Sequence, residues 1–274
     1  MLSEIFQPLR GLAAAATVFA VPASAGQPVI EPPQTVLFTA GGPPEGEVYR
    51  AGIGIHLADG WHTYWRHPGD AGIAPTLTTE GSQNLKAVQL VFPAPERWSD
   101  GYSTSIVYHG DVLLPLMVHA ADPSQPVVLD LQLTFGFCRE ICVPGEATFS
   151  ATLSPDDGAR PSAAERIADA LDRVPVAETD GALPAVIAVE PDGPEAVRIR
   201  VRTAPGAAAE TDLFVEPPDG WYIGQPQPVG VETDVAVFHL SLNGRPKAAT
   251  VSGTPMRFTV ATPDGGIEAV RALP

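Results

Sequence analysis

Two residues, Cys138 and Cys142, have the chemistry for electron transfer, and they are the only cysteines in the 274-residue sequence. A regular strand-like segment ends at Cys138, and Pro144 closely follows Cys142. Such a pair can form a disulfide if a turn brings the two Cα atoms within about 7 Å. Closing so short a loop would stabilise the fold by only about 2 kcal/mol, and strain makes such a bond easier to reduce. The spacing therefore favours a redox-active pair over a structural disulfide.

Two other interpretations stay open: an inert disulfide staple, and a Cu(I) site formed by the reduced thiols of Cys138 and Cys142. Thiol–disulfide exchange needs no cofactor, because a thiolate attacks a disulfide sulfur and the second cysteine resolves the mixed disulfide. Arg139 would lower the pKa of a neighbouring thiol, while Glu140 would oppose it. No histidine lies at zinc-finger spacing from the cysteines. The histidines that could add a copper ligand are His56, His62, His67, His109, His119 and His239.

The N-terminus has the pattern of a secretory signal. Arg10 precedes an apolar run at residues 11–21, and Ala23-Ser24-Ala25 forms a small-residue cleavage site. We therefore expect residues 1–25 to be removed and the mature chain to be exported to a compartment where disulfides can form. No later run is long enough to span a bilayer, so no membrane insertion is expected. The net charge of −16 excludes nucleic-acid binding, which needs a basic face.

Alternating apolar residues predict an all-β protein. The clearest alternation covers 127–137, where Leu129, Leu131 and Leu133 lie between polar residues. Roughly eight short strands before residue 155 indicate a β-sandwich. Seven of them are predicted at 34–40, 48–57, 88–92, 106–108, 113–118, 127–137 and 148–153.

A helix starting with a capping box at Ser162 and Glu165 should connect this sandwich to a second β domain. Strand patterns return at 197–201, 212–215, 235–242 and 256–261. The predicted organisation is a signal peptide at 1–25, a redox sandwich at 26–158, a helical linker at 159–178 and a second, smaller β-sandwich domain at 179–274.

Three segments resemble the N-terminal periplasmic domain of DsbD-type protein-disulfide reductases, in particular the ScsB branch. They are Cys-Arg-Glu-Ile-Cys-Val-Pro at 138–144, the aromatic block at 60–72, and the segment ending in Leu-Pro at 108–115. The resemblance covers roughly residues 35–155. It implies an immunoglobulin-like sandwich with the cysteines at one end. Members of the family continue into a membrane domain and a thioredoxin domain, which this sequence does not show. Either a separate membrane protein supplies the electrons, or the domain has another use.

The resemblance also implies roles. Partners would engage Cys142, and Cys138 would resolve the mixed disulfide. The domain would take electrons from a membrane-embedded thiol reductase and reduce periplasmic thioredoxin-like proteins. A cap loop would fall at 99–102, with Tyr102 shielding the pair, Asp100 tuning its pKa, and Trp98 compensating for a glycine where the family has an aromatic. The aromatic block at 61–70 could form a surface that docks a partner or contacts copper, but we favour its interpretation as a turn that packs the sandwich.

Overall fold

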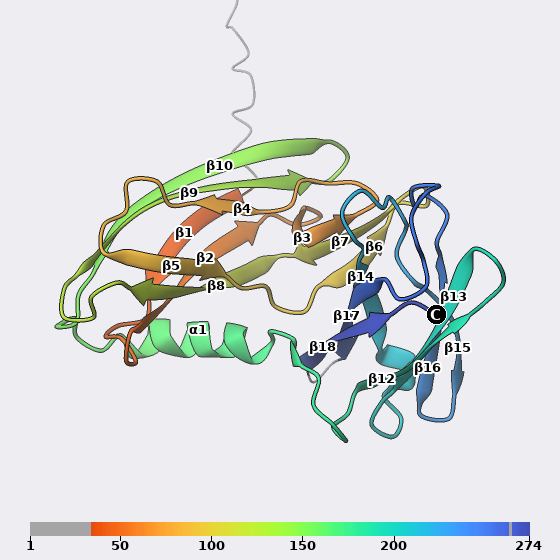
Figure 1. The fold of residues 1–274 in the computed structure, drawn as a ribbon. Coiled ribbons are helices and arrows are strands. Elements are labelled where there is room, and N and C mark those ends of the chain that lie inside the picture. Colours follow the sequence, from red (N-terminus) through yellow and green to blue (C-terminus); the bar gives the residue numbers. More distant parts are fainter. Residues whose placement is uncertain (1–33, 263–264) are drawn as a thin grey trace, which may run out of the picture. The chain divides into compact units, whose positions relative to one another are not determined.

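The computed structural model describes residues 34–262 and 265–274, so the predicted signal peptide lies outside the described residues. The described chain is almost entirely β, with one α-helix, α1 (Pro161–Asp172), between two β domains (Figure 1). None of its described helices has the length and apolarity needed to cross a membrane.

The first β domain is an immunoglobulin-like sandwich of two antiparallel sheets. One sheet has four strands, in the order β1 (Gln34–Ala40), β2 (Val48–Leu57), β8 (Asp111–Ala120), β5 (Leu85–Leu90). The other has six: β10 (Cys142–Leu153), β9 (Val127–Cys138), β3 (His62–Gly69), β7 (Thr104–His109) and β6 (Glu96–Ser99) in order, with β4 (Thr76–Thr78) also paired to β9. The predicted alternation at 127–137 is confirmed, because every odd-numbered residue of β9 up to Phe137 is buried between the sheets.

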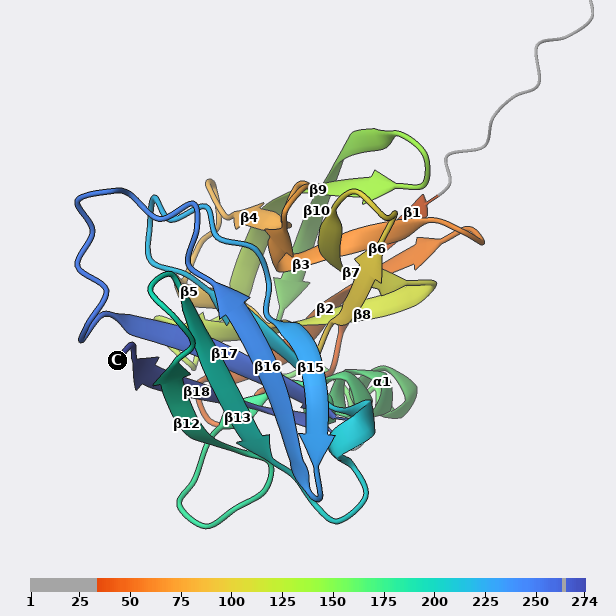
Figure 2. The same cartoon turned by 90° about the vertical axis from the view of Figure 1, so that its right-hand side faces the viewer.

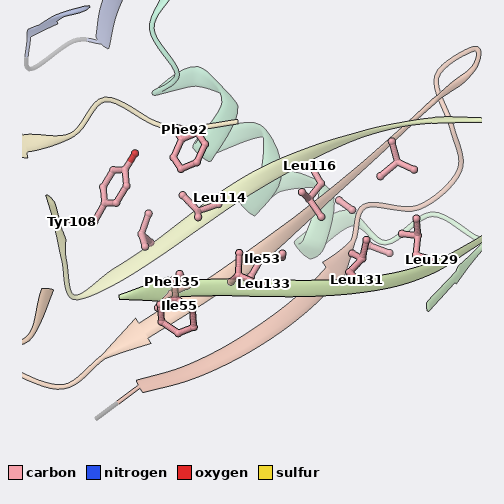
Figure 3. Close-up of a cluster of buried hydrophobic side chains, with 14 of the residues drawn as sticks. Ile53, Ile55, Phe92, Tyr108, Leu114, Leu116, Leu129, Leu131, Leu133 and Phe135 are labelled. Carbon is pink, nitrogen blue, oxygen red and sulfur yellow. The ribbon is translucent and has the colours of Figure 1, made fainter. Parts of the chain in front are cut away.

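The core of this sandwich is built from aliphatic and aromatic side chains of both sheets (Figure 3). Ile53 and Ile55 come from β2, Leu114 and Leu116 from β8, and the leucines at 129, 131 and 133 from β9. All of these side chains are almost fully buried. The inner face of the six-stranded sheet is therefore fully used for packing, and any chemistry on that sheet belongs to its outer face.

The helix differs from its prediction at its start. Helix α1 begins at Pro161, with Arg160 as its N-cap and no side-chain capping bond, so the predicted capping box at Ser162 and Glu165 is wrong. Proline suits the first helical turn because its fixed φ is helical and its missing N–H is not needed there. Ile167 and Ala170 pack on Leu113 of β8. The connecting helix thus covers part of the first sandwich.

The second half of the chain contains two further sheets of four strands each. One has the order β11 (Val176–Ala177), β18 (Gly265–Ala272), β17 (Pro255–Thr262), β14 (Asp212–Glu216). The other, seen face-on in Figure 2, has the order β12 (Ala185–Pro191), β13 (Ala196–Arg202), β16 (Val235–Ser241), β15 (Gln227–Glu232). A short 3-10 helix occupies Ala208–Glu210. Most buried side chains of these two sheets form a separate hydrophobic cluster, while Phe214 of β14 packs with the core of the first sandwich. The domain boundaries at 158 and 178 stay a prediction.

The aromatic block at 61–70 forms strand β3, so the predicted turn was wrong, but its predicted packing role is confirmed because Trp65 is buried in the core of the sandwich. The first four residues of β3 are all buried, so it lacks the alternation by which a strand is recognised.

Farther along β3, the Arg66 guanidinium pairs with Glu216 of β14 at 2.6 Å and lies 4.3 Å from the Trp65 ring centre. Arg97 of β6 pairs with Asp212 at 2.7 Å. Two strands that border the cysteine site are therefore tied by ion pairs to the C-terminal sheets.

Candidate redox site

The two cysteines form a disulfide across the tight turn between β9 and β10. Cys138 is the last residue of β9 and Cys142 the first of β10, and they face each other in the strand register. Their Cα atoms are 4.2 Å apart, well inside the limit for a bridge. Cys138 is only 7% exposed, whereas Cys142 is an exposed residue. The two sulfur positions are therefore unequal, and Cys142 is the one that a partner can approach.

The cysteines belong to a row of four side chains that crosses the outer face of the six-stranded sheet. In the register, Cys142 lies opposite Cys138, Cys138 opposite His62, and His62 opposite His109. Residues directly opposite each other on antiparallel strands point to the same face, with Cβ atoms about 4.5–5.5 Å apart. We call this row of Cys142, Cys138, His62 and His109 the redox rung. It places the His62 imidazole on the strand next to Cys138 and the His109 imidazole one strand farther away.

Tyr64, two residues after His62 on β3, contacts the exposed sulfur. Its hydroxyl lies 3.0 Å from Sγ of Cys142, and it must be the donor because a disulfide sulfur carries no hydrogen. Burial raises the pKa of Tyr64, so the hydroxyl keeps its proton at neutral pH. Two glycines leave room for the ring: a Cβ on Gly72 would overlap it, and one on Gly136 would lie 3.1 Å from its Cε2. The two glycines form a slot that holds Tyr64 against Cys142.

His62 is buried beside this slot and lacks a polar contact. Its side chain is 1% exposed, and Nε2 has no hydrogen-bond partner within the described part of the chain. Its ring is perpendicular to that of Tyr64, at 5.4 Å, and lies 4.6 Å from Trp98 and 5.7 Å from His109. Burial, and secondly the nearby His109, lower the pKa of His62 to about 4. With the disulfide closed, His62 is therefore a neutral imidazole at physiological pH.

The structure brings one of the three predicted cap residues to the cysteines. Trp98 of β6 packs with Tyr64 and Cys138 in a small outer-face cluster. The Asp100 carboxylate accepts hydrogen bonds from the N–H groups of Ser103 and Tyr102, both at 2.8 Å, and these bonds lower its pKa. Asp100 thus orders its own turn. Tyr102 is 99% exposed, so its side chain covers no part of the disulfide here, and its gating role stays a prediction.

The turn between the two cysteines carries one positive and one negative side chain, Arg139 and Glu140, which lie close to each other. The Arg139 guanidinium lies 5.9 Å from the Trp61 ring centre and 3.9 Å from the Glu140 carboxylate, and both side chains are largely exposed. Exposed pairs of this kind have weak effects. Neither charge therefore dominates the environment of the cysteines.

The remaining candidate ligands do not gather around the cysteines as a metal centre. Across residues 34–262 and 265–274, no three His, Cys, Asp or Glu side chains are grouped so that they could hold a metal ion. Cu(I) binding by the reduced pair stays a prediction.

Sequence reasoning missed the roles of His62 and Tyr64. Both lie in the block that was interpreted as a turn. The available signal was their spacing: in a strand, residues two apart share a face. Had the segment been recognised as a strand beside β9, both side chains would have been placed on the outer face with the cysteines.

Comparison with known proteins supports the family resemblance and the fold. Residues 27–154 match the family model for the N-terminal region of the thiol:disulfide interchange protein DsbD. The N-terminal periplasmic domain of ScsB from Proteus mirabilis shares the fold, with a TM-score of 0.70, 20% identity, and coverage of 88% of this chain and 93% of that one.

The DsbD N-terminal domain of Neisseria meningitidis in the reduced form gives 16% identity, coverage of 45% and 86%, and a TM-score of 0.27, too low to support an argument. No curated protein sequence matches. The family match, the cysteine pair at a strand end and the immunoglobulin-like sandwich agree with one another. Residues 27–154 therefore belong to the DsbD N-terminal domain family and form a thiol–disulfide interchange module with one cysteine pair.

Proposed function

We propose that this protein works in the periplasm, where it carries electrons from a membrane-embedded thiol reductase to thioredoxin-like proteins through Cys138 and Cys142. The observation that carries the proposal is the unequal exposure of the two sulfur positions: Cys138 is 7% exposed and Cys142 faces solvent. A partner can form a mixed disulfide with an exposed cysteine, and a buried neighbour is then placed to resolve it.

Reduction of a partner begins with both cysteines as thiols. The Cys142 thiolate attacks one sulfur of the partner's disulfide, and the other partner sulfur leaves with the electron pair. Cys138 then attacks Cys142, the mixed disulfide breaks, and the second partner sulfur leaves as a thiolate. Two electrons pass to the partner, and the pair returns to the disulfide seen in the structure. A membrane reductase would then reduce the Cys138–Cys142 disulfide to two thiols by the reverse sequence of steps.

Tyr64 suits the first step. Its hydroxyl already donates to Sγ of Cys142 in the oxidised protein. A thiolate at the same position accepts a stronger, charge-assisted bond. The hydroxyl would thus lower the pKa of the Cys142 thiol and increase the fraction of the reactive form.

A trapping experiment tests the assignment. Reduced Cys138→Ala protein, mixed with an oxidised periplasmic thioredoxin-like protein, should accumulate a mixed disulfide through Cys142, identified by intact-mass and peptide mass spectrometry. The matched Cys142→Ala variant should accumulate far less, because its remaining thiol is buried.

Two results would contradict the proposal. One is the absence of a mixed disulfide with every thioredoxin-like partner and redox buffer tried. The other is a reduction potential of the pair well below about −300 mV, the range of inert structural disulfides.

A further inference from the structure

We propose that His62 accepts the proton of the Cys138 thiol when the disulfide opens, and so makes Cys138 an effective resolving nucleophile. The inference rests on the proposed function, because it assigns a chemical role within the same exchange cycle. It starts from a buried imidazole nitrogen, Nε2 of His62, which has no hydrogen-bond partner among the described residues.

Strand geometry places that imidazole beside the resolving cysteine. His62 and Cys138 are directly opposite each other in the register of β3 and β9, so their side chains leave the same face. Both are buried, at 1% and 7% exposure. The disulfide holds the Cys138 sulfur toward Cys142, on the side of β9 away from His62. Opening the bond frees this sulfur to rotate about its Cα–Cβ bond toward the imidazole.

Buried polar atoms in folded proteins nearly always have a partner, and exceptions call for an explanation. For Nε2 of His62, the partner is the Cys138 sulfur once the disulfide has opened. A freed Cys138 thiol can donate to Nε2, or a Cys138 thiolate can accept from it. The unpartnered nitrogen of the oxidised protein is then the partner of Cys138 in the mixed disulfide and in the reduced protein.

The surroundings of His62 favour a proton that comes and goes with the thiolate. Tyr64 and Trp98 contribute rings to its environment, and the second imidazole, His109, lies 5.7 Å away. Nδ1 of His109 lies 3.1 Å from the Glu96 carboxylate. No negative charge contacts His62 directly within the described chain, and burial lowers its pKa to about 4 in the oxidised protein. A thiolate at Cys138 would supply the missing charge and stabilise an imidazolium–thiolate pair.

In the mixed disulfide, the Cys138 S–H bond breaks and its proton moves to Nε2 of His62. The Cys138 sulfur forms a bond to Sγ of Cys142, and the bond between Sγ of Cys142 and the partner's sulfur breaks. The electron pair leaves with the partner's sulfur, and the proton passes from His62 to that thiolate or to water. His62 ends neutral, as it began.

The first test uses the native sequence and NMR. Long-range ¹H–¹⁵N spectra of the imidazoles would be recorded between pH 4 and pH 9 in the oxidised and the reduced protein. In the oxidised protein, His62 should remain neutral down to about pH 4. In the reduced protein, it should titrate at higher pH, together with the Cys138 thiol. Identical His62 titrations in the two redox states would overturn the proposal.

The second test measures the pKa of the Cys138 thiol from the pH dependence of iodoacetamide alkylation in a Cys142→Ala background. His62→Phe should raise the midpoint, so that the thiolate fraction at pH 7 falls about tenfold. His62→Gln, which keeps a hydrogen bond but accepts no proton, should also raise it. His119→Phe, a matched substitution on β8, should leave it unchanged. Equal midpoints with and without His62 would overturn the assignment.

The two proposals fail separately. A trapped mixed disulfide at Cys142 together with an unchanged His62 titration would remove only the role of His62. A redox-dependent His62 titration without any trapped complex would remove only the proposed exchange with thioredoxin-like partners.

Discussion

Replacing Gly136 with alanine should disrupt the slot that holds Tyr64 against the exposed sulfur. A Cβ at position 136 would lie 2.8 Å from Cβ of Ile73 and 3.1 Å from Cε2 of Tyr64. The first distance is too short for a real contact, and Ile73 cannot retreat freely because its carbonyl accepts the Gly136 N–H at 3.0 Å. The backbone of Gly72 also lies close to the Tyr64 ring and limits where that ring can move. One of these groups must therefore move.

The cost can be set against the usual benefit of alanine. Overpacking a filled site costs about 1–3 kcal/mol. Replacing glycine by alanine without strain contributes about 0.4–1 kcal/mol in the opposite direction, through the unfolded chain. We expect Gly136→Ala to lower the free energy of unfolding by about 1–2 kcal/mol, measured by urea denaturation of the oxidised protein. Gly230→Ala is the matched strand control, because its Cβ would meet nothing within 4 Å. That variant should be as stable as the parent or slightly more stable.

Reactivity provides a second readout. If the ring of Tyr64 moves, its hydroxyl leaves Cys142, and the Cys142 thiol pKa of the reduced Gly136→Ala protein should rise. Gly230→Ala should show no such rise. A Gly136→Ala protein that matches Gly230→Ala in both the urea midpoint and the Cys142 pKa would refute the reasoning about the slot.

Three further outcomes are expected. Tyr64→Phe, which removes only the hydroxyl, should slow alkylation of the Cys142 thiol at pH 7 by about three- to tenfold, with the urea midpoint nearly unchanged; equal rates would show that the bond has no effect. Arg66→Ala removes the ion-pair partner of the partly buried Glu216 and leaves Glu268 only its longer pair with Arg257. It should cost about 2–4 kcal/mol in urea denaturation, against less than about 1 kcal/mol for the exposed pair removed by Arg50→Ala. The pKa of His62 is about 4 in the folded protein and about 6.5 in the unfolded chain. As the pH drops below about 6.5, the unfolded chain therefore binds the proton first, and the free energy of unfolding decreases. Between pH 7 and pH 4.5 this loss should reach about 2 kcal/mol and be missing from His62→Phe; equal pH dependence in urea denaturation would contradict it.

The sequence predicted the elements whose two faces differ. Strand β9 alternates because one face lines the core and the other faces outward, and the same asymmetry defines β2. Strand β3 was missed because both of its faces are buried over the first four residues: Trp65 packs in the core, while Tyr64 is covered by the segment around Gly72 and Ile73. Strand β15 was missed for the opposite reason, since all of its residues are exposed. Periodicity disappears when the two faces share one environment.

The candidate site, like the fold, was predicted only in part. The cysteines were found because their type and spacing alone indicate redox chemistry. His62 and Tyr64 were not assigned to the site, because their importance depends on which strand lies beside β9. The pairing of β3 with β9 is made through residues far apart in the sequence, and no local pattern at 60–72 encodes it.

The redox rung depends on register more than on any single contact. A shift of β3 by one residue against β9 would place Trp61 or Thr63 opposite Cys138 and turn His62 toward the core. The Thr63 hydroxyl opposes this shift, because it is buried and donates to the carbonyl of Gly136 at 2.7 Å. Loss of the register would leave the Thr63 hydroxyl without its hydrogen bond and move the Trp65 side chain out of the core. The packing of the inner face thus fixes the alignment of the outer face, where the sulfur chemistry takes place.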